Sequence, residues 1–172
     1  MLKAISQFFR KESYPEKRKE YLQWRDVVFS ITSTQVGVLS DQPNQVYGVI
    51  MDVGITDDFI ISITAFPTRE SSLMTTVGGG VIGLGGDQII GDHARRIVSL
   101  AQSLIEKTKR TDEHNMPKSQ RVHFYFLTTS GLMKEQATVN EAYAQDYPFH
   151  EMFERFTAIK TRSEELTKAS DG

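Results

Sequence analysis

Two stretches in the first half of the chain are almost continuously apolar, and they predict two interior strands. Residues 46–53 read VYGVIMDV and residues 59–66 read FIISITAF, with the polar, turn-like residues 54–58 between them. A strand that is apolar at nearly every position is typical of a sheet covered on both faces. Because the connection is short, the two strands are expected to pair as an antiparallel hairpin.

Further strands are predicted before and after a long helix. SLMTTV, residues 72–77, comes before the helix, and RVHFYFLTT, residues 121–129, comes after it. Successive strand residues face opposite sides of a sheet, which places Val122, Phe124 and Phe126 on one side and His123, Tyr125 and Leu127 on the other. Ser130 and Gly131 form a tight-turn signal, after which residues 132–139 are expected to return antiparallel.

Residues 87–109 carry the clearest helical pattern. Apolar residues recur every three or four positions and make one face, formed by Ile90, Ala94, Ile97, Val98, Ala101, Leu104 and Ile105. Asp87 stands where a carboxylate can accept the free backbone N–H groups of a helix start. The helix is predicted to pack on the sheet and to bury Ile97, Val98, Ala101 and Leu104.

Residues 1–25 predict a helical N-terminal segment in two parts. Residues 1–10 have apolar and basic side chains at helical spacing, namely Leu2, Ile5, Phe8 and Phe9 beside Lys3, Arg10 and Lys11. This part suits packing on its own domain or lying on a membrane surface, and its two to three turns favour the domain because short helices bind membranes weakly. A second helix runs from Pro15 to about Trp24, and the β-branched residues of 27–38 then predict a short strand.

The end of the chain predicts one more helix. Pro148 is a suitable helix start, and an apolar stripe at helical spacing follows it, made of Phe149, Met152, Phe153, Phe156 and Ile159. Residues 163–172 are polar and are expected to fray. The elements together predict an α+β fold: a single, mostly antiparallel sheet with one long helix packed on it and terminal helices. A length of 172 residues fits one domain, residues 1–172.

Charge and composition exclude several classes of protein. The net charge of −2 argues against a general nucleic-acid binder, which usually has a basic excess. The chain has no cysteine, so disulfide scaffolds, thiol catalysis and thiolate metal sites are ruled out. No apolar run is long enough to span a bilayer, and the N-terminus does not resemble a secretory signal. We therefore expect a cytoplasmic protein that does not associate with membranes.

The glycine-rich segment 77–91, VGGGVIGLGGDQIIG, is the most unusual part of the sequence. Gly78, Gly80 and Gly83 satisfy the G-x-G-x-x-G pattern of dinucleotide binding, and they are the candidate cofactor-binding residues. The parallel βαβ context of that motif is absent, no Gly-Lys-Ser/Thr follows, and Asp87 would repel an anion at the helix start. We therefore favour a structural role, in which the glycines supply positive φ or close backbone packing.

Several of these stretches resemble an uncharacterised family of small bacterial proteins. The shared pattern consists of VYGVIMDVG, ISITAF, SLMTTVGGGVIGLG before a helix, and later RVHFYFLTTSG. The resemblance covers most of the chain after Trp24. It implies a bacterial, cytoplasmic protein, and since the family carries no established activity it transfers no site residues.

The titratable residues match no catalytic or metal template. The four histidines, His93, His114, His123 and His150, lack ligand spacing, so we assign no metal site, no cofactor and no catalytic residue. His114 is expected to be solvated, and His123 to be a partly buried, hydrogen-bonded residue. A site assembled from distant parts of the chain stays open.

Three classes of function remain. We favour a non-catalytic interaction or regulatory module with a protein partner or self-association, such as a homodimer, because the sequence specifies a packed scaffold most clearly. The alternatives are a binder of nucleotide or phosphate at the glycine-rich segment and an enzyme with a scattered site. The largest pocket would discriminate, since converging polar groups favour a ligand or substrate and an exposed apolar surface favours a partner.

Overall fold

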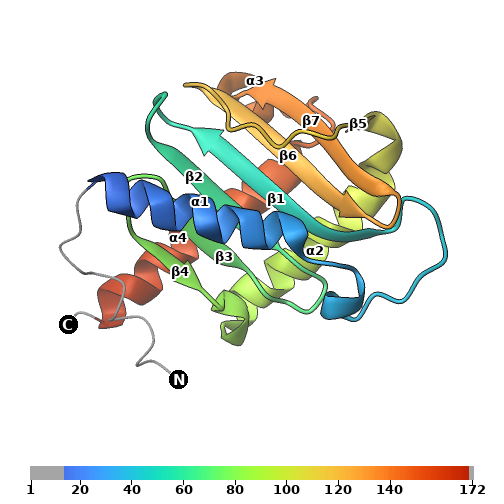
Figure 1. Ribbon diagram of the computed structural model, residues 1–172, viewed down its shortest axis with the longest axis horizontal. Helices are drawn as coiled ribbons and strands as arrows, with labels where there is room; N and C mark the ends of the chain where they lie inside the picture. The colour runs from blue at the N-terminus through green and yellow to red at the C-terminus, as the bar shows by residue number, and fades with distance from the viewer. Residues whose placement is uncertain (1–13, 171–172) are drawn as a thin grey trace.

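The computed structural model describes residues 14–170, which build a seven-stranded antiparallel sheet with helices on both faces (Figure 1). The strands are β1 (Val46–Gly54), β2 (Ile60–Ala65), β3 (Ser72–Thr75), β4 (Gly80–Ile82), β5 (Lys109–Arg110), β6 (Arg121–Thr128) and β7 (Gly131–Thr138). The α-helices are α1 (Tyr14–Ser30), α2 (Gln88–Leu104), α3 (Val139–Tyr143) and α4 (His150–Ser170). Short 3-10 helices occur at Thr34–Val36, Leu84–Gly86 and Ile105–Lys107. The predicted α+β class is confirmed.

The strand order is β4-β3-β2-β1-β6-β7-β5, and each neighbouring pair is antiparallel. β1 and β2 form the predicted hairpin, with Val49 opposite Ala65 and Gly54 opposite Ile60. β6 and β7 form the second predicted hairpin around Gly131. β1 also pairs with β6, so the two most apolar segments and RVHFYFLT lie side by side at the centre of the sheet.

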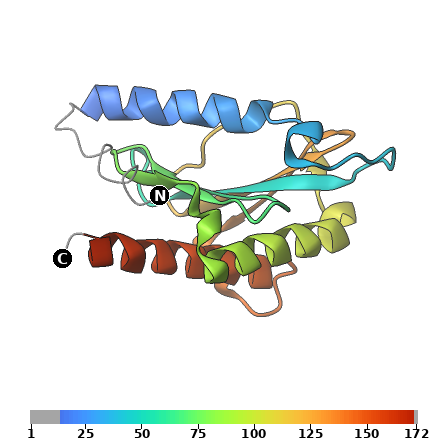
Figure 2. The ribbon, with the colours of Figure 1, turned by 90° about the horizontal axis from the view of Figure 1, so that it is seen from below.

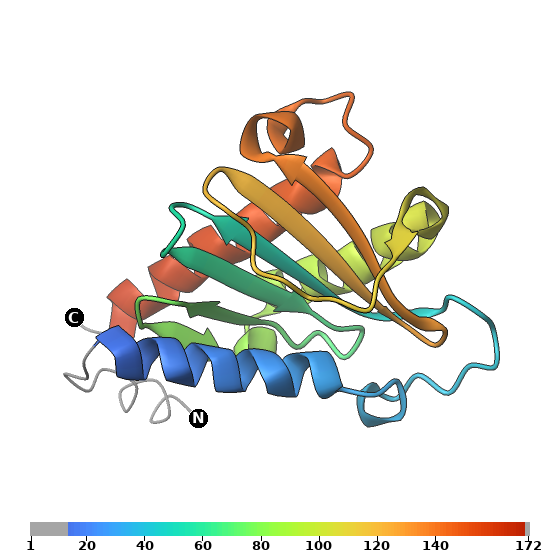
Figure 3. The same ribbon diagram turned by 45° about the horizontal axis from the view of Figure 1, so that its top comes forward.

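The sheet lies between two layers of helix. Figure 2 shows α1 on one face and α2 with α4 on the other, and Figure 3 gives the same arrangement from another side. Alternate residues of β6 therefore enter different cores: Phe124 and Phe126 join the cluster under α2 and α4, whereas Tyr125 and Leu127 join the cluster under α1. Coverage of both faces explains why the central strands are apolar at almost every position.

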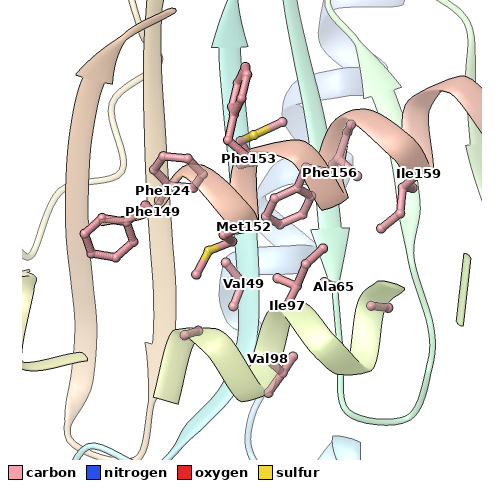
Figure 4. Packing of buried hydrophobic residues seen from close by; sticks show 14 of the residues in the cluster. Val49, Ala65, Ile97, Val98, Phe124, Phe149, Met152, Phe153, Phe156 and Ile159 are labelled. Carbon is pink, nitrogen blue, oxygen red and sulfur yellow. The ribbon is translucent and has the colours of Figure 1, made fainter. Parts of the chain in front are cut away.

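The main core fills the space between the sheet and the pair α2 and α4. Figure 4 shows Phe124 and Phe149 packed beside Met152, with Phe153 and Phe156 continuing along α4. The stripe predicted in residues 149–159 is confirmed, since all five of its apolar residues are buried. Figure 4 also shows Ile97 of α2 approaching Val49 of β1, so both helices share this core.

The long helix differs from its prediction at its C-terminal end. Asp87 caps α2 as expected, because its side chain accepts a hydrogen bond from the Ile90 N–H. Ile97, Val98 and Ala101 are buried, but Leu104 is only half-buried. The α-helix ends at Leu104 and continues as a 3-10 turn, which changes the side-chain direction and buries Ile105 instead.

The strand predicted in residues 27–38 is wrong, since α1 continues to Ser30 and a 3-10 turn follows. Val28 lies on the same helical face as Arg25, one turn earlier, and Tyr21, two turns earlier, so packing on the sheet overrides the strand preference of β-branched residues. At the other end, α4 extends to Ser170, through the stretch from residue 163 that we expected to fray. The helix predicted in residues 1–10 lies outside the described residues.

Substitutions of Ile97 and Leu104 on α2 test how this helix packs on the sheet. Ile97→Ala should lower the free energy of unfolding by about 2–5 kcal/mol, because it removes a fully buried side chain from the main core. Leu104→Ala should cost less than half as much, since its side chain is already partly in water. Urea denaturation of both variants measures the difference, and equal losses would contradict the position of Leu104.

Candidate functional site

The glycine-rich segment builds a hairpin and a helix entry. Gly78 and Gly79 have φ of 92° and 85° and form the turn between β3 and β4. Gly80 begins β4, where its Cα lies so close to Met74 that a Cβ would collide with the Met74 side chain and come within 2.7 Å of the Leu73 carbonyl oxygen. Gly83, with φ of 78°, precedes the 3-10 turn that leads to α2. A strand therefore intervenes between the first glycines and the helix.

The N-terminus of α2 is already occupied by a carboxylate of the chain itself. Besides capping Ile90, Asp87 accepts two hydrogen bonds from the Arg162 guanidinium, at 3.0 and 3.1 Å. Partial burial raises the pKa of Asp87, but the hydrogen bonds from Arg162 and Ile90 outweigh it and hold the pKa below its usual value. A phosphate at this helix start would have to displace a charged group, so the geometry supports the structural role of Gly78, Gly80 and Gly83 over nucleotide binding.

A group of buried polar side chains lies under α1. Arg25 of α1 and Asp52 of β1 form a buried ion pair, with Nη1 and Oδ2 2.6 Å apart and the two side chains 3% and 0% exposed. The two atoms are close enough for an ion pair, but they do not have the geometry of a hydrogen bond. The Tyr21 hydroxyl donates to Ser62 Oγ at 2.6 Å, and Ser62 Oγ donates to Asp52 Oδ1 at 2.5 Å. We call Tyr21, Arg25, Asp52 and Ser62 the α1 network.

The loop between β5 and β6 closes the α1 network on the outside. Arg25 Nη2 donates to the His114 carbonyl at 2.6 Å, and the Tyr125 hydroxyl donates to the Asn115 carbonyl at 2.5 Å. His123 Nδ1 also contacts the Asn115 carbonyl, at 3.0 Å. The partial burial expected for His123 is confirmed, whereas the His114 ring is exposed but lies against Phe29, with the ring centres 4.4 Å apart.

Burial sets the titration of these groups. It raises the pKa of Tyr21 to about 12, with Asp52 acting in the same direction. Burial by itself would lower the pKa of Arg25, but Asp52 and Tyr21 raise it above its usual value. Burial and Lys134 lower the pKa of His123. Near neutral pH Arg25 of the network is thus charged, whereas Tyr21 and the neighbouring His123 are neutral, an arrangement that fixes a helix–sheet contact and offers no accessible proton donor.

An open groove lies on the opposite face of the sheet. It has a volume of about 710 Å³ and lies between α4 and the strands β2, β3 and β4. Its sheet side is mainly apolar, formed by Ile55, Phe59, Ile61, Leu73 and Val81 together with Thr75 and Gly80. Its other side is the C-terminal half of α4, with Lys160, Ser163, Glu164, Thr167 and Lys168. We call it the α4 groove.

The apolar stripe of α4 explains why the groove exists. Met152, Phe156 and Ile159 fill the space between helix and sheet, and the next core-facing position along the helix is Ser163. A small side chain there leaves the end of the main core unfilled. A smaller pocket of about 220 Å³ continues from the groove, sharing Ile55, Ile61 and Lys160 with it, and reaches Met51 and Phe153 in the core.

Most polar groups along the α4 groove, Lys168 excepted, already have partners within the chain. Ser163 and Thr167 donate to helix carbonyls of Lys160 and Ser163, at 2.7 and 3.0 Å, and Lys160 pairs with Glu164 at 2.6 Å. Thr75 donates to the Gly78 carbonyl at 2.6 Å. What the groove presents to a ligand is therefore an apolar floor with a charged rim.

The other two histidines, His93 and His150, belong to α2 and α4. His93 of α2 approaches Arg155 at 3.4 Å, whereas His150 at the start of α4 contacts the Ala142 carbonyl at 3.1 Å and Glu154 at 3.3 Å. Among residues 14–170, no three His, Asp or Glu side chains gather closely enough to hold a metal ion. None of the helices in that range has the length and apolar character that a bilayer span requires.

No protein-family profile, curated protein or solved structure matches this chain. The resemblance to small bacterial proteins therefore stays a prediction from the sequence, and the functional argument rests on the geometry of the α4 groove and of the α1 network. The sequence did not single out either of them. Ser163 one turn after an apolar stripe and Asp52 within an apolar strand were the available signals.

Substitution of Gly80 tests the structural role of the glycine segment. Gly80→Ala should destabilise the protein by about 1–3 kcal/mol, because the added methyl group collides with Met74 and the Leu73 carbonyl. Gly86→Ala is the control, since nothing lies within 4 Å of its Cβ position, and its effect should stay within about 1 kcal/mol. Thermal unfolding with and without nucleotides measures both. Equal stability of Gly80→Ala and wild type would refute the close packing.

Substitutions in the α1 network test its ion pair. Arg25→Met or Asp52→Leu alone should each cost about 3–5 kcal/mol, because each leaves an unpaired buried charge. The double variant should be more stable than either single variant, since no charge is left behind. The exposed pair Arg69–Asp92 is the control, and Asp92→Asn should change stability by no more than about 1 kcal/mol. Additive losses in denaturant titrations would show that the two charges do not interact.

Proposed function

We propose that the protein is a non-catalytic interaction module whose α4 groove binds the apolar face of an amphipathic segment of a protein partner. The observation that carries the proposal is the open apolar floor of this groove beside a charged rim. Helix-in-groove recognition uses this combination, because the apolar stripe of an amphipathic helix replaces water on the floor while its polar flanks stay in solvent.

The rim favours a segment with charges along its edges. Lys160, Glu164 and Lys168 succeed one another every four residues on α4, so they form one row beside the apolar floor. Lys160 and Glu164 neutralise each other, while Lys168 is exposed. An amphipathic partner can meet this row with side chains of either charge, whereas a nucleotide would meet only one exposed lysine.

Two observations favour binding over catalysis. Thr75, Ser163 and Thr167 of the α4 groove are hydrogen-bonded to backbone carbonyls, so they do not converge on a common point as the groups of an active site do. The α1 network does bring a serine, a carboxylate and a tyrosine together, but Asp52, Ser62 and Tyr21 are 0% exposed. A substrate could reach these groups only after α1 had left the sheet.

The volume of the α4 groove also suits a small apolar molecule, since ligand pockets have volumes of about 300–1,000 Å³. The length of the charged row on α4 favours a segment of protein, because a small molecule with one polar end would use only part of it. A fatty acid is therefore included as a competitor in the test.

Methyl NMR of the full chain tests the proposal with a synthetic amphipathic helical peptide of leucine and lysine. Saturable shifts are expected at Ile55, Ile61, Leu73 and Val81, because their methyl groups line the floor. Leu39 is the control: it is 83% exposed on a different part of the surface, so its shifts should not change. Equal shifts at Leu39 and in the groove would contradict a specific site.

Two variants of α4 make the test sharper. Thr167→Trp fills the α4 groove and should abolish the peptide-induced shifts. Thr161→Trp places the same side chain on an exposed position of the same helix that does not line the groove, and it should leave them unchanged. Tighter binding of decanoate than of the peptide would instead indicate a small-molecule binder. Saturable shifts of the backbone amide signals of Gly78, Gly80 and Gly83 on addition of a nucleotide would favour the glycine-rich site.

A further inference from the structure

We propose that residues 1–13 of the chain cover the α4 groove of the same molecule and compete there with the partner. This inference rests on the proposed function, because it assigns to the same groove an occupant from within the chain. It concerns regulation: a partner must displace this segment before it can bind.

The first argument is the place at which the described chain begins. The Tyr14 hydroxyl at the start of α1 donates to the Asp58 carbonyl at 3.1 Å, and Arg18 approaches the Asp58 carboxylate at 4.0 Å. Asp58 belongs to the turn between β1 and β2. On the two sides of this turn stand Ile55 and Phe59, both of which line the α4 groove. Residues 1–13 therefore join the fold at one end of the groove.

A second contact places α1 at the neighbouring hairpin. The side chain of Lys17 lies so close to Gly78, in the turn between β3 and β4, that a Cβ on Gly78 would collide with it. Gly80, two residues later, lines the α4 groove. The first turn of α1 thus contacts both hairpin turns that lead into the groove, so a segment that passes around this edge of the sheet enters the groove directly.

The segment is long enough to cover the groove. As a helix, its 13 residues would span about 20 Å, at a rise of about 1.5 Å per residue. The charged row from Lys160 to Lys168 extends over about 12 Å by the same measure. An extended chain would reach further still.

The chemistry of the segment matches the groove. Leu2, Ile5, Phe8 and Phe9 share one side of a helix, which fits the apolar floor. Lys3, Arg10 and Lys11 flank that side. The acidic turn at Asp57 and Asp58 lies where the segment enters, and the side chain of Asp58 is 85% exposed. The entry therefore attracts the basic residues next to Tyr14.

Covalent attachment favours this occupant over a free one. A tethered segment has a high effective concentration at a site within reach, so weak contacts suffice to keep the groove covered. The other destination considered for an amphipathic basic segment is a membrane surface. Docking in the groove would bury the same apolar side chains, so the two destinations exclude each other.

Disulfide trapping tests the position of the segment, since the chain contains no cysteine of its own. Ser6→Cys is paired with Thr167→Cys on α4, or with Thr75→Cys on the sheet side of the groove. The control pair is Ser6→Cys with Thr161→Cys, which is exposed on α4 outside the groove. Intramolecular cross-linking of at least one groove pair should be about tenfold faster than that of the control, because a held cysteine has a higher effective concentration. Equal rates, or products between two molecules only, would overturn the proposal.

Dye binding gives a readout that does not depend on cysteine geometry. Phe8→Ser combined with Phe9→Ser should raise the fluorescence of bound 8-anilinonaphthalene sulfonate several-fold, because it uncovers an apolar floor. Adding Thr167→Trp should remove this gain, whereas adding Thr161→Trp should not. Unchanged fluorescence in the Phe8/Phe9 variant would count against the proposal. The proposal would also be contradicted if the wild type bound phosphatidylglycerol vesicles, the Phe8/Phe9 variant did not, and no groove cross-link formed.

The outcomes separate this inference from the proposed function. If the cross-links fail but the leucine–lysine peptide still shifts the groove methyl groups, the groove binds partners and the N-terminal segment does not cover it. If the cross-links form but the peptide leaves these methyl groups unchanged even in the Phe8/Phe9 variant, the segment covers the groove as part of the fold and the proposed function is wrong.

Discussion

The structure depends on the need to cover both faces of one antiparallel sheet. β1, β2 and β6 carry apolar side chains toward both sides, and a face left in water would cost the burial free energy of every one of them. α2 and α4 cover one face, and α1 covers the other (Figure 2). The second face is covered by one helix only, and the two helices on the first face cover it incompletely. The α1 network and the α4 groove arise from this difference.

On the side of α1 a single helix has to be held on the sheet, and buried polar groups hold it together with two apolar clusters. The Arg25–Asp52 pair is among the most buried charges described, and Ser62, which accepts a hydrogen bond from Tyr21, donates to the other oxygen of Asp52. A buried ion pair adds little stability compared with apolar residues of the same shape. A misplaced helix would, however, leave an unpaired buried charge, which is strongly destabilising. The network therefore specifies where α1 lies and, through the His114 and Asn115 carbonyls, where the loop before β6 lies.

On the side of α2 and α4 the coverage is incomplete. The core is filled by large side chains as far as Ile159, but Ser163 is small and Leu166 is only partly buried against the core, so the sheet beyond them is left as the floor of the α4 groove. The position of α1 matters here as well, because its first turn brings residues 1–13 to the end of this groove. In our proposal the polar network on one face thus determines which segment is available to cover the apolar groove on the other.

The sequence by itself determined the class of fold. Continuous apolar runs, the helical stripes of residues 87–105 and 149–159, and the cap at Asp87 are local patterns, and local patterns follow from helix and strand periodicity. It also indicated that the glycine-rich segment lacks the context of a nucleotide site. The strand predicted in residues 27–38 was wrong because contacts of Val28 with the sheet outweigh its intrinsic preference.

Only the tertiary structure decided the candidate sites. Arg25 and Asp52 are 27 positions apart, and Phe59 and Thr167 are 108 positions apart, and no periodicity connects them. Ser163 looks like the start of a polar tail until α4 is seen to continue to Ser170 with this serine facing the core. The physical reason is that a pocket is a property of what surrounds a residue. Which side chains surround it depends on how distant elements pack, and the local patterns of one amino-acid sequence do not give that packing directly.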